Sequence, residues 1–245
     1  MSSASNIEWT NATWNPVTGC SLISEGCVNC YARRMAKRLK AMGLRRYKNG
    51  FLVSTHQDLI EIPLHWKKAR FIFVNSMSDL FHEEVPFEFI EQVFSTIHSA
   101  SWHVFQVLTK RADRLEQIAN RLIWPKNLWI GVTVESRQHV HRIKKLETVP
   151  AAVRFVSFEP LLGPIESLDL THIDWAIVGG ESGPHSRPMD AGWARTIRDT
   201  CIDHSIPFFF KQWGGLRKQR HGRILDDRIW NEFPSIAAVS QDLAL

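Results

Sequence analysis

Residues 103–134 read HVFQVLTKRADRLEQIANRLIWPKNLWIGVTV and combine two apolar runs with an amphipathic stretch between them. The runs, 103–108 and 128–134, are nearly continuous in apolar character, which is typical of strands buried on both faces of a parallel sheet. Between the runs, apolar residues recur at helical spacing, namely Leu115, Ile118 and Leu122. The stretch therefore predicts a strand, a crossover helix and a second, parallel strand.

The same alternation continues outward from this unit in both directions. Helical stripes of apolar residues lie at 89–97, 140–146 and 193–201. Further strand-like runs lie at 70–74, 153–158, 175–178 and 207–210, with a first strand near 7–14. We therefore predict an α/β fold in which six to seven mainly parallel strands form a partial, TIM-barrel-like (β/α) barrel.

The length of 245 residues and the hydrophobic content of 44% suit one barrel-sized domain. We predict a single domain over 1–245, in which 1–31 is an N-terminal segment and 235–245 is a loose tail. No apolar run reaches the roughly 18 residues of a membrane span, and the N-terminus does not resemble a signal peptide. Because three of the four cysteines are clustered rather than spread through the chain, we expect a reduced, cytoplasmic location.

The cysteines lie in residues 13–31, TWNPVTGCSLISEGCVNCY, where Cys20, Cys27 and Cys30 have the spacing C-x6-C-x2-C. We expect Cys27 and Cys30 at the start of a helix, where the helix dipole and the nearby Arg33 and Arg34 favour thiolates. Three thiolates suit a soft metal centre, whereas a disulfide would leave one thiol over and zinc would need a fourth ligand. A [4Fe–4S] cluster held by three cysteines would leave one iron open for a substrate or cofactor.

The fourth cysteine, Cys201, lies on the apolar stripe of a predicted helix. A free cysteine in such a position behaves as a small apolar core residue. We therefore predict that Cys201 is buried and is not a ligand of a metal centre.

Two resemblances follow from these residues. The phrases TWNPVTGC, FEPLLG, VGGESG and FFFKQWG, spread over residues 7 to 234, resemble a phage-type three-Cys-motif family of uncharacterised proteins. The cysteine loop itself resembles that of radical S-adenosylmethionine (SAM) enzymes, although that superfamily mostly uses C-x3-C-x2-C. The second resemblance implies a [4Fe–4S] cluster on the three cysteines, SAM as cofactor and an external electron donor. It further implies reductive cleavage of SAM to a 5′-deoxyadenosyl radical, and it leaves the substrate unnamed.

Polar and charged residues recur where the predicted strands end, which is the edge that carries the active site in such barrels. We predict that these residues line one cofactor-binding rim, although strands that simply end in polar loops are the alternative. In radical SAM enzymes a Gly-Gly-Glu-type segment after the second strand meets the amino group of SAM. Here Ser76, Ser78 and Asp79 stand at that place, and Gly179–Glu181 follows a later strand. The predicted rim residues are Ser76, Ser78, Asp79, Lys110, Glu135, Glu159, Gly179, Gly180, Glu181 and Lys211.

The net charge of +5 is unevenly distributed, because residues 33–48 carry many cations and no acid, and residues 211–223 form a second basic run. Such runs suit a polyanionic partner, so a nucleic acid or nucleotide-like substrate is one hypothesis and a merely solvated basic surface is the other.

Two further functions remain open. One is a zinc module, with the three cysteines and a histidine, that binds nucleic acid without catalysis. The other is a metal-dependent barrel hydrolase or nuclease using Asp79, Glu135 and Glu159.

Overall fold

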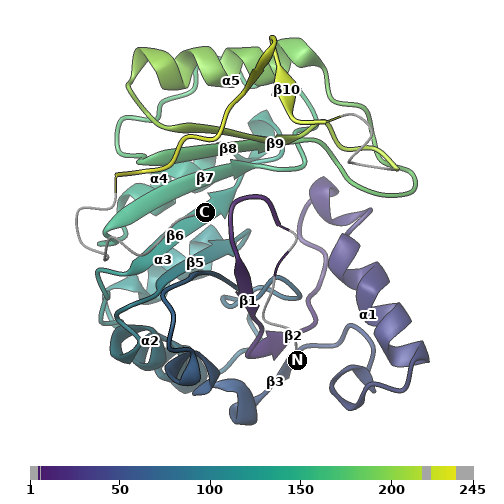
Figure 1. Ribbon diagram of the computed structural model, residues 1–245, viewed down its shortest axis with the longest axis vertical. Helices are drawn as coiled ribbons and strands as arrows, with labels where there is room; N and C mark the ends of the chain where they lie inside the picture. Colours follow the sequence, from purple (N-terminus) through teal and green to yellow (C-terminus); the bar gives the residue numbers. More distant parts are fainter. Residues whose placement is uncertain (1–4, 6, 217–221, 236–245) are drawn as a thin grey trace.

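A computed structural model describes residues 5, 7–216 and 222–235 of the chain. Its main feature is one open sheet of seven strands in the order β1-β4-β5-β6-β7-β8-β9, in which every neighbouring pair is parallel. The sheet curls into a half-barrel, as Figure 1 shows. The strands are β1 Ala12–Trp14, β4 Phe71–Val74, β5 Val104–Thr109, β6 Leu128–Thr133, β7 Val153–Phe158, β8 Trp175–Gly179 and β9 Phe208–Gln212. The predicted partial barrel is therefore confirmed.

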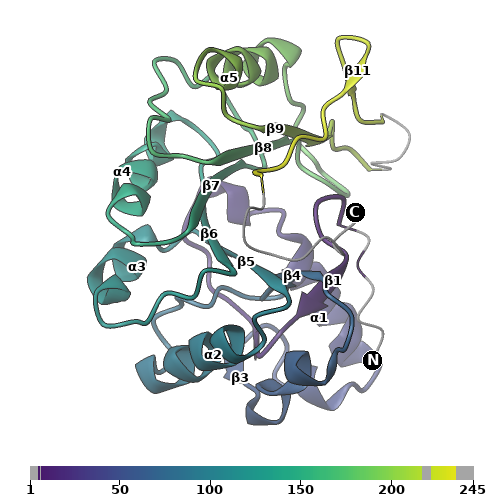
Figure 2. The same cartoon turned by 60° about the vertical axis from the view of Figure 1, so that its left-hand side comes forward.

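Of the five α-helices in the described residues, α2 to α5 connect successive strands and cover the outer face of the curl (Figure 2). The remaining helix, α1, lies apart from this layer and follows the cysteine loop directly (Figure 1). The helices are α1 Tyr31–Ala41, α2 Phe87–Ser99, α3 Ala112–Ala119, α4 His141–Glu147 and α5 Ala191–Asp203.

Short elements decorate the connections between the longer ones. Two small antiparallel pairs join β2 (Val17–Thr18) to β3 (Ser54–Thr55) and β10 (Ile224–Leu225) to β11 (Arg228–Ile229). Single 3₁₀ turns are η1 Glu25–Cys27, η2 Arg45–Tyr47, η3 Gln57–Leu59, η4 Ile62–His65 and η5 Arg137–His139. Part of the second basic run, 217–221, and the predicted loose tail from 236 onward lie outside the described residues.

The sheet buries apolar side chains on both faces, which explains the continuous apolar runs of its strands. One core contains the apolar stripes of α2 to α5 together with strand residues such as Ile72, Val107 and Ile130. A second core contains alternating strand residues and no helix residue, so it fills the inside of the curl. Its aromatic rings pack edge to face, as between Trp129 and Trp175, whose centroids are 5.8 Å apart.

Inside the curl, the side chains change from aromatic to small and polar toward the carboxyl edge of the sheet. In the register of the sheet, Thr133 pairs with Ser157, and Ser157 pairs with Ile177. Glu135 and Glu159 come two residues after Thr133 and Ser157, just beyond the ends of β6 and β7. Because parallel strands share one direction, their carboxyl ends meet at one edge, and small and polar groups gather there above the aromatic filling. No helix in the described part of the chain is long and apolar enough to cross a membrane.

Candidate functional site at the carboxyl edge of the sheet

The cysteine loop, residues 19–30, lies across the carboxyl edge of the sheet. All three of its cysteines are free thiols and are partly exposed. Cys27 ends the turn η1, and Cys30 is the residue before α1, so Cys27 precedes the helix instead of lying at its start. Gly19 has φ +84°, and a Cβ there would lie 2.1 Å from the carbonyl oxygen of Leu52. Only glycine fits at that position, which is where the loop leaves β2.

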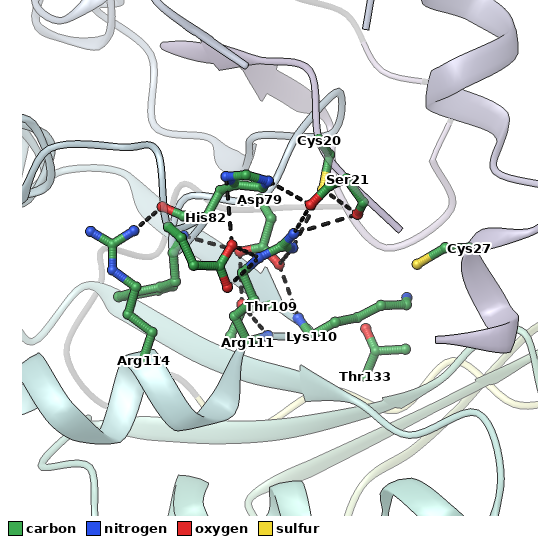
Figure 3. A network of polar contacts seen from close by, with 12 residues as sticks. Cys20, Ser21, Cys27, Asp79, His82, Thr109, Lys110, Arg111, Arg114 and Thr133 are labelled. Atoms are coloured by element: carbon green, nitrogen blue, oxygen red, sulfur yellow. Dashed lines mark hydrogen bonds and ion pairs between the residues drawn. The ribbon is translucent and has the colours of Figure 1, made fainter. Parts of the chain in front are cut away.

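The first corner of the loop is held by Asp79 and Arg111 (Figure 3). Asp79 follows β4 and accepts hydrogen bonds from Thr109 Oγ1 at 2.7 Å, from the Lys110 amide at 3.1 Å and from Arg111 Nη1 at 3.2 Å. Arg111 in turn donates to Cys20 Sγ at 3.4 Å. The predicted rim residue Asp79 therefore binds the ends of β4 and β5 together and reaches the cysteine loop through an arginine.

The middle of the loop is held by Glu135, whose side chain is completely buried after β6. Glu135 pairs with Arg142 at 2.7 Å and with Lys110 at 3.5 Å, and it accepts a hydrogen bond from Ser24 Oγ. Burial alone would raise the pKa of Glu135, but the two cations and Ser24 lower it, so the carboxylate is ionised. A Cβ on Gly26 would lie 2.6 Å from Glu135 Cγ, so the close approach of the loop depends on that glycine.

The end of the loop is held by Glu181, which follows β8. Its carboxylate accepts hydrogen bonds from Asn29 Nδ2 at 3.0 Å and from the Arg187 amide and Nε at 2.9 Å. Arg187 also donates to the carbonyl of Glu25 at 3.0 Å. Arg34 donates to the carbonyl of Ser182 at 3.1 Å, so its guanidinium is bound to the 182–184 turn and not to the thiols near which the sequence analysis placed it.

Other predicted rim residues also have partners within the protein. Ser76 Oγ donates to Asn15 Oδ1 at 3.2 Å, and Ser78 Oγ donates to the carbonyl of Val17 at 2.8 Å, so both fasten the N-terminal segment to the end of β4. At Gly180 a Cβ would lie 2.1 Å from the carbonyl oxygen of Trp213. The absence of a side chain there accommodates a neighbouring backbone segment.

One predicted pair at this edge, Glu159 and Lys211, makes no hydrogen bond to the cysteine loop in the described residues. Lys211 Nζ lies 2.6 and 2.8 Å from the two carboxylate oxygens of Glu159. A Cβ on Gly179 would lie 3.3 Å from Glu159 Cδ, so this glycine lets the carboxylate pack closely against the end of β8. Below the pair, Ser157 Oγ is buried and has no hydrogen-bond partner in the described structure. Unlike Asp79, Glu135 and Glu181, this pair does not hold the cysteine loop in the described structure.

The surroundings of the thiols bear on the kind of metal centre that they suit. Burial and the charge of Asp79 raise the pKa of Cys20 to about 11, against the opposing effect of Arg111, so the free thiol is protonated. A bound metal centre would displace that proton. Within the described ranges, no three His, Cys, Asp or Glu side chains lie close enough together to hold a single metal ion. The zinc site and the three-carboxylate site that the sequence analysis left open are therefore not preformed.

Several side chains that hold the loop were absent from the predicted set, among them Ser24, Arg111, Arg142 and Arg187. Arg111 directly follows the predicted rim residue Lys110, so its position at a strand end was a usable signal. Arg142 lies on α4 and Arg187 in the segment before α5, where nothing in the local pattern distinguishes them from solvated arginines.

We predict that the docking of the loop weakens in acid. Hydrogen bonds from Ser136 and His139 outweigh desolvation and lower the pKa of Glu25 from 4.5 to about 2. Because the folded-state pKa is depressed, the stabilisation is present above pH 4.5 and is lost as pH falls toward 2. Urea-unfolding midpoints measured across this range should fall less steeply for Glu25→Gln than for the unmodified chain. Equal slopes would show that Glu25 does not contribute.

Comparisons with known proteins were made for the chain and its fold. A family model described as "Protein of unknown function (DUF5131)" matches residues 4–234. No curated protein matches the sequence. Solved structures of spore photoproduct lyase are similar in fold. A cysteine variant has TM-score 0.47 and 12% identity over 73% of this chain. The complex with dinucleoside spore photoproduct has TM-score 0.47 and 11% identity over 80% of this chain. This chain spans 58% and 62% of the length of those two chains.

Proposed function

The chain belongs to the DUF5131 family, whose description names no reaction, and we propose from its own residues that it is an iron–sulfur enzyme of the radical SAM type. The observation that carries the proposal is that three free cysteines in one loop lie over the carboxyl edge of a parallel half-barrel. Cys20, Cys27 and Cys30 would hold a [4Fe–4S] cluster, with one iron left for SAM. When bound, the cluster and SAM would supply radical chemistry: one electron from an external donor would cleave SAM to methionine and a 5′-deoxyadenosyl radical, which would abstract hydrogen from the substrate.

The donor set fits such a cluster better than it fits one metal ion. A single zinc ion needs four ligands converging at about 2.0–2.3 Å, and the described residues offer no such group. A cluster instead binds each thiolate at a different iron, so its ligands need not converge on one point. The loop also has its own supports on β4, β6 and β8, through Asp79, Glu135 and Glu181. These acids therefore serve the cofactor by fixing the loop.

We propose that Glu159 and Lys211 contact SAM directly. The methionine end of SAM carries an ammonium and a carboxylate, and an ion pair presents the complementary charges side by side. Glu159 would meet the ammonium and Lys211 the carboxylate, with Gln212 Nε2, 3.5 Å from Glu159, beside them. Gly179 lets Glu159 pack closely against the end of β8, and the unpartnered Ser157 hydroxyl comes two residues before Glu159. The pair thus presents opposite charges at the carboxyl edge of the sheet.

The test is anaerobic reconstitution with iron and sulfide followed by SAM titration. We expect about four irons per chain and saturable SAM binding. Lys211→Ala or Glu159→Gln should weaken SAM binding about tenfold or more, since each removes a charge-assisted hydrogen bond worth roughly 1.5–3 kcal/mol. Lys144→Ala, at an exposed lysine on α4, is the matched control and should bind SAM normally. A colourless protein with stoichiometric zinc would contradict the proposal, and unchanged binding by both variants would contradict the role of the pair.

For the substrate, we propose a nucleic acid or a nucleotide-like, phosphate-bearing molecule. A surface pocket of about 680 Å³ lies between residues 44–49 and 54–58, and its lining includes Arg45, Lys48 and His56. The segment that joins the two sides of this pocket contacts the cysteine loop, because the Cys20 amide donates to the carbonyl of Phe51 at 3.1 Å. Arg34, by contrast, donates to backbone carbonyls. We therefore place the phosphate contacts in this pocket and not along α1.

Charge reversal at the pocket should weaken binding to single-stranded DNA or RNA. Binding through phosphates weakens with salt by a log–log slope near −0.7 per contact on single strands. The double variant Arg45→Glu/Lys48→Glu should therefore bind more weakly and show a flatter slope in a fluorescence-anisotropy titration. Lys67→Glu/Lys68→Glu, at exposed residues before the amino end of β4, is the control with the same charge change. If both double variants lose affinity equally, the pocket is not the binding site.

A further inference from the structure

Arg111 is a buried arginine in direct contact with the cysteine loop. It lies between β5 and α3, at the carboxyl edge of the sheet, and only 3% of it is exposed. Figure 3 shows its guanidinium between Asp79 and the Cys20–Ser21 segment. A buried cation is costly unless it is paired and hydrogen-bonded, and Arg111 has partners of both kinds.

Each nitrogen of the guanidinium has at least one acceptor. Nε lies 2.9 and 3.2 Å from the two carboxylate oxygens of Glu83. Nη1 donates to Asp79 Oδ2 at 3.2 Å and to Cys20 Sγ at 3.4 Å. Nη2 donates to Ser21 Oγ at 2.9 Å and to the Ser21 carbonyl at 3.4 Å. Two carboxylates thus fix the planar guanidinium from the sheet side, and its other N–H groups point at the loop.

The contact distinguishes Cys20 from the other two cysteines. Cys27 Sγ has Ser24 Oγ at 3.7 Å, and in the described residues no arginine or lysine donates to Cys27 or Cys30. The neighbouring Ser21 is fixed on its far side as well, because its hydroxyl lies 2.8 Å from His82 Nε2. Arg111 therefore acts on one thiol of three and on the segment that carries it.

We propose that Arg111 is a positioning residue for Cys20, and that its N–H raises the reduction potential of the cluster that Cys20 would help to hold. This inference rests on the proposed iron–sulfur function. A hydrogen bond to a ligand sulfur stabilises the added electron of the reduced cluster, so it makes reduction easier. The carboxylates of Asp79 and Glu83 offset the charge of Arg111. Arg111 therefore acts on Cys20 Sγ through its N–H hydrogen bond. Arg111 thus sets both where Cys20 lies and how readily the cluster takes an electron.

The experiment compares Arg111→Gln and Arg111→Lys with Arg114→Gln in the full-length, reconstituted chain. Arg114 is on α3, which begins directly after Arg111, and it donates to the backbone carbonyls of His82 and Val85, so its loss removes one nearby cation without touching a cysteine. The midpoint potential is measured by redox titration followed by electron paramagnetic resonance. Arg111→Gln should lower the ratio of reduced to oxidised cluster at least tenfold at fixed potential, which is a shift of at least about 59 mV to more negative values for one electron. Arg111→Lys should lie between, because one ammonium keeps the charge but cannot reach all the acceptors.

Hydrogen–deuterium exchange on the cluster-free chain tests the positioning role separately. Residues 19–23 should exchange faster in both Arg111 variants and at the unmodified rate in Arg114→Gln. Equal potentials and equal exchange in Arg111→Gln and Arg114→Gln would overturn the inference, and Arg111→Lys decides it if the glutamine variant does not fold. A chain that takes up no cluster would overturn the proposed function and the potential shift together. The exchange measurement would still support or overturn the role of Arg111 in holding the loop.

Discussion

Changing Cys20, Cys27 or Cys30 to alanine, one at a time, is expected to reduce iron incorporation from about four atoms per chain to near zero. A cluster bound by three thiolates has no protein ligand to spare, and the described structure places no further cysteine or histidine with them at ligand distance. The loop should remain docked in each variant, because Arg111, Glu135 and Glu181 also bind Ser21, Ser24 and Asn29 of the loop. Iron assays and visible absorbance after anaerobic reconstitution measure the effect.

Cys201 provides the internal control for these variants. It lies on α5, is fully buried, and has a pKa that burial raises to about 12. These properties confirm the prediction that Cys201 is a core residue. Cys201→Ala should therefore take up as much iron as the unmodified chain. Full iron content in any single loop variant, or loss of iron in Cys201→Ala, would show that the ligand set is wrong.

Replacing Glu135 by alanine is expected to lower the free energy of unfolding by about 3–5 kcal/mol, the usual cost of breaking a buried ion pair. The change leaves the buried Arg142 without its carboxylate and removes the acceptor for Ser24. The same loss should free the middle of the cysteine loop and reduce iron uptake. Urea unfolding followed by tryptophan fluorescence at neutral pH measures the first effect, and iron assays measure the second.

A matched control for Glu135 is Asp113→Ala, which removes a carboxylate from an exposed ion pair with Lys145. Exposed pairs contribute little to stability, so this variant should unfold close to the unmodified chain and keep its iron uptake. If Glu135→Ala behaves like the control in both measurements, Glu135 does not anchor the loop. If it is destabilised but binds iron normally, its role is confined to the fold.

The strands of this protein could be predicted from local pattern because the sheet is buried on both faces. Every residue of β6, for example, is buried, and its six residues stand within one apolar run. Helical spacing likewise located the apolar faces of α2 to α5. The carboxyl-edge position of Asp79, Glu135, Glu159, Glu181 and Lys211 followed from parallel strand direction alone.

The partners of those side chains could not be predicted in the same way. Ser24 and Glu135 are 111 residues apart in the sequence, and Asn29 and Glu181 are 152 apart. A carboxylate at the end of a strand has the same local sequence pattern whether it meets a ligand or a loop. Gly180 is similar, because a glycine that admits a ligand and one that admits the backbone of Trp213 are equivalent in sequence.

The sequence by itself therefore determined a parallel, partial α/β barrel with three clustered cysteines before its first long helix. Both features depend on short-range pattern, namely burial periodicity and the spacing of like side chains. Only the tertiary structure decided which edge residues hold the cysteine loop and which, as Glu159 and Lys211, make no hydrogen bond to it in the described structure. The physical reason is that hydrogen bonds and ion pairs act over about 3–4 Å in space, and the curl of the sheet sets which distant residues come within that range.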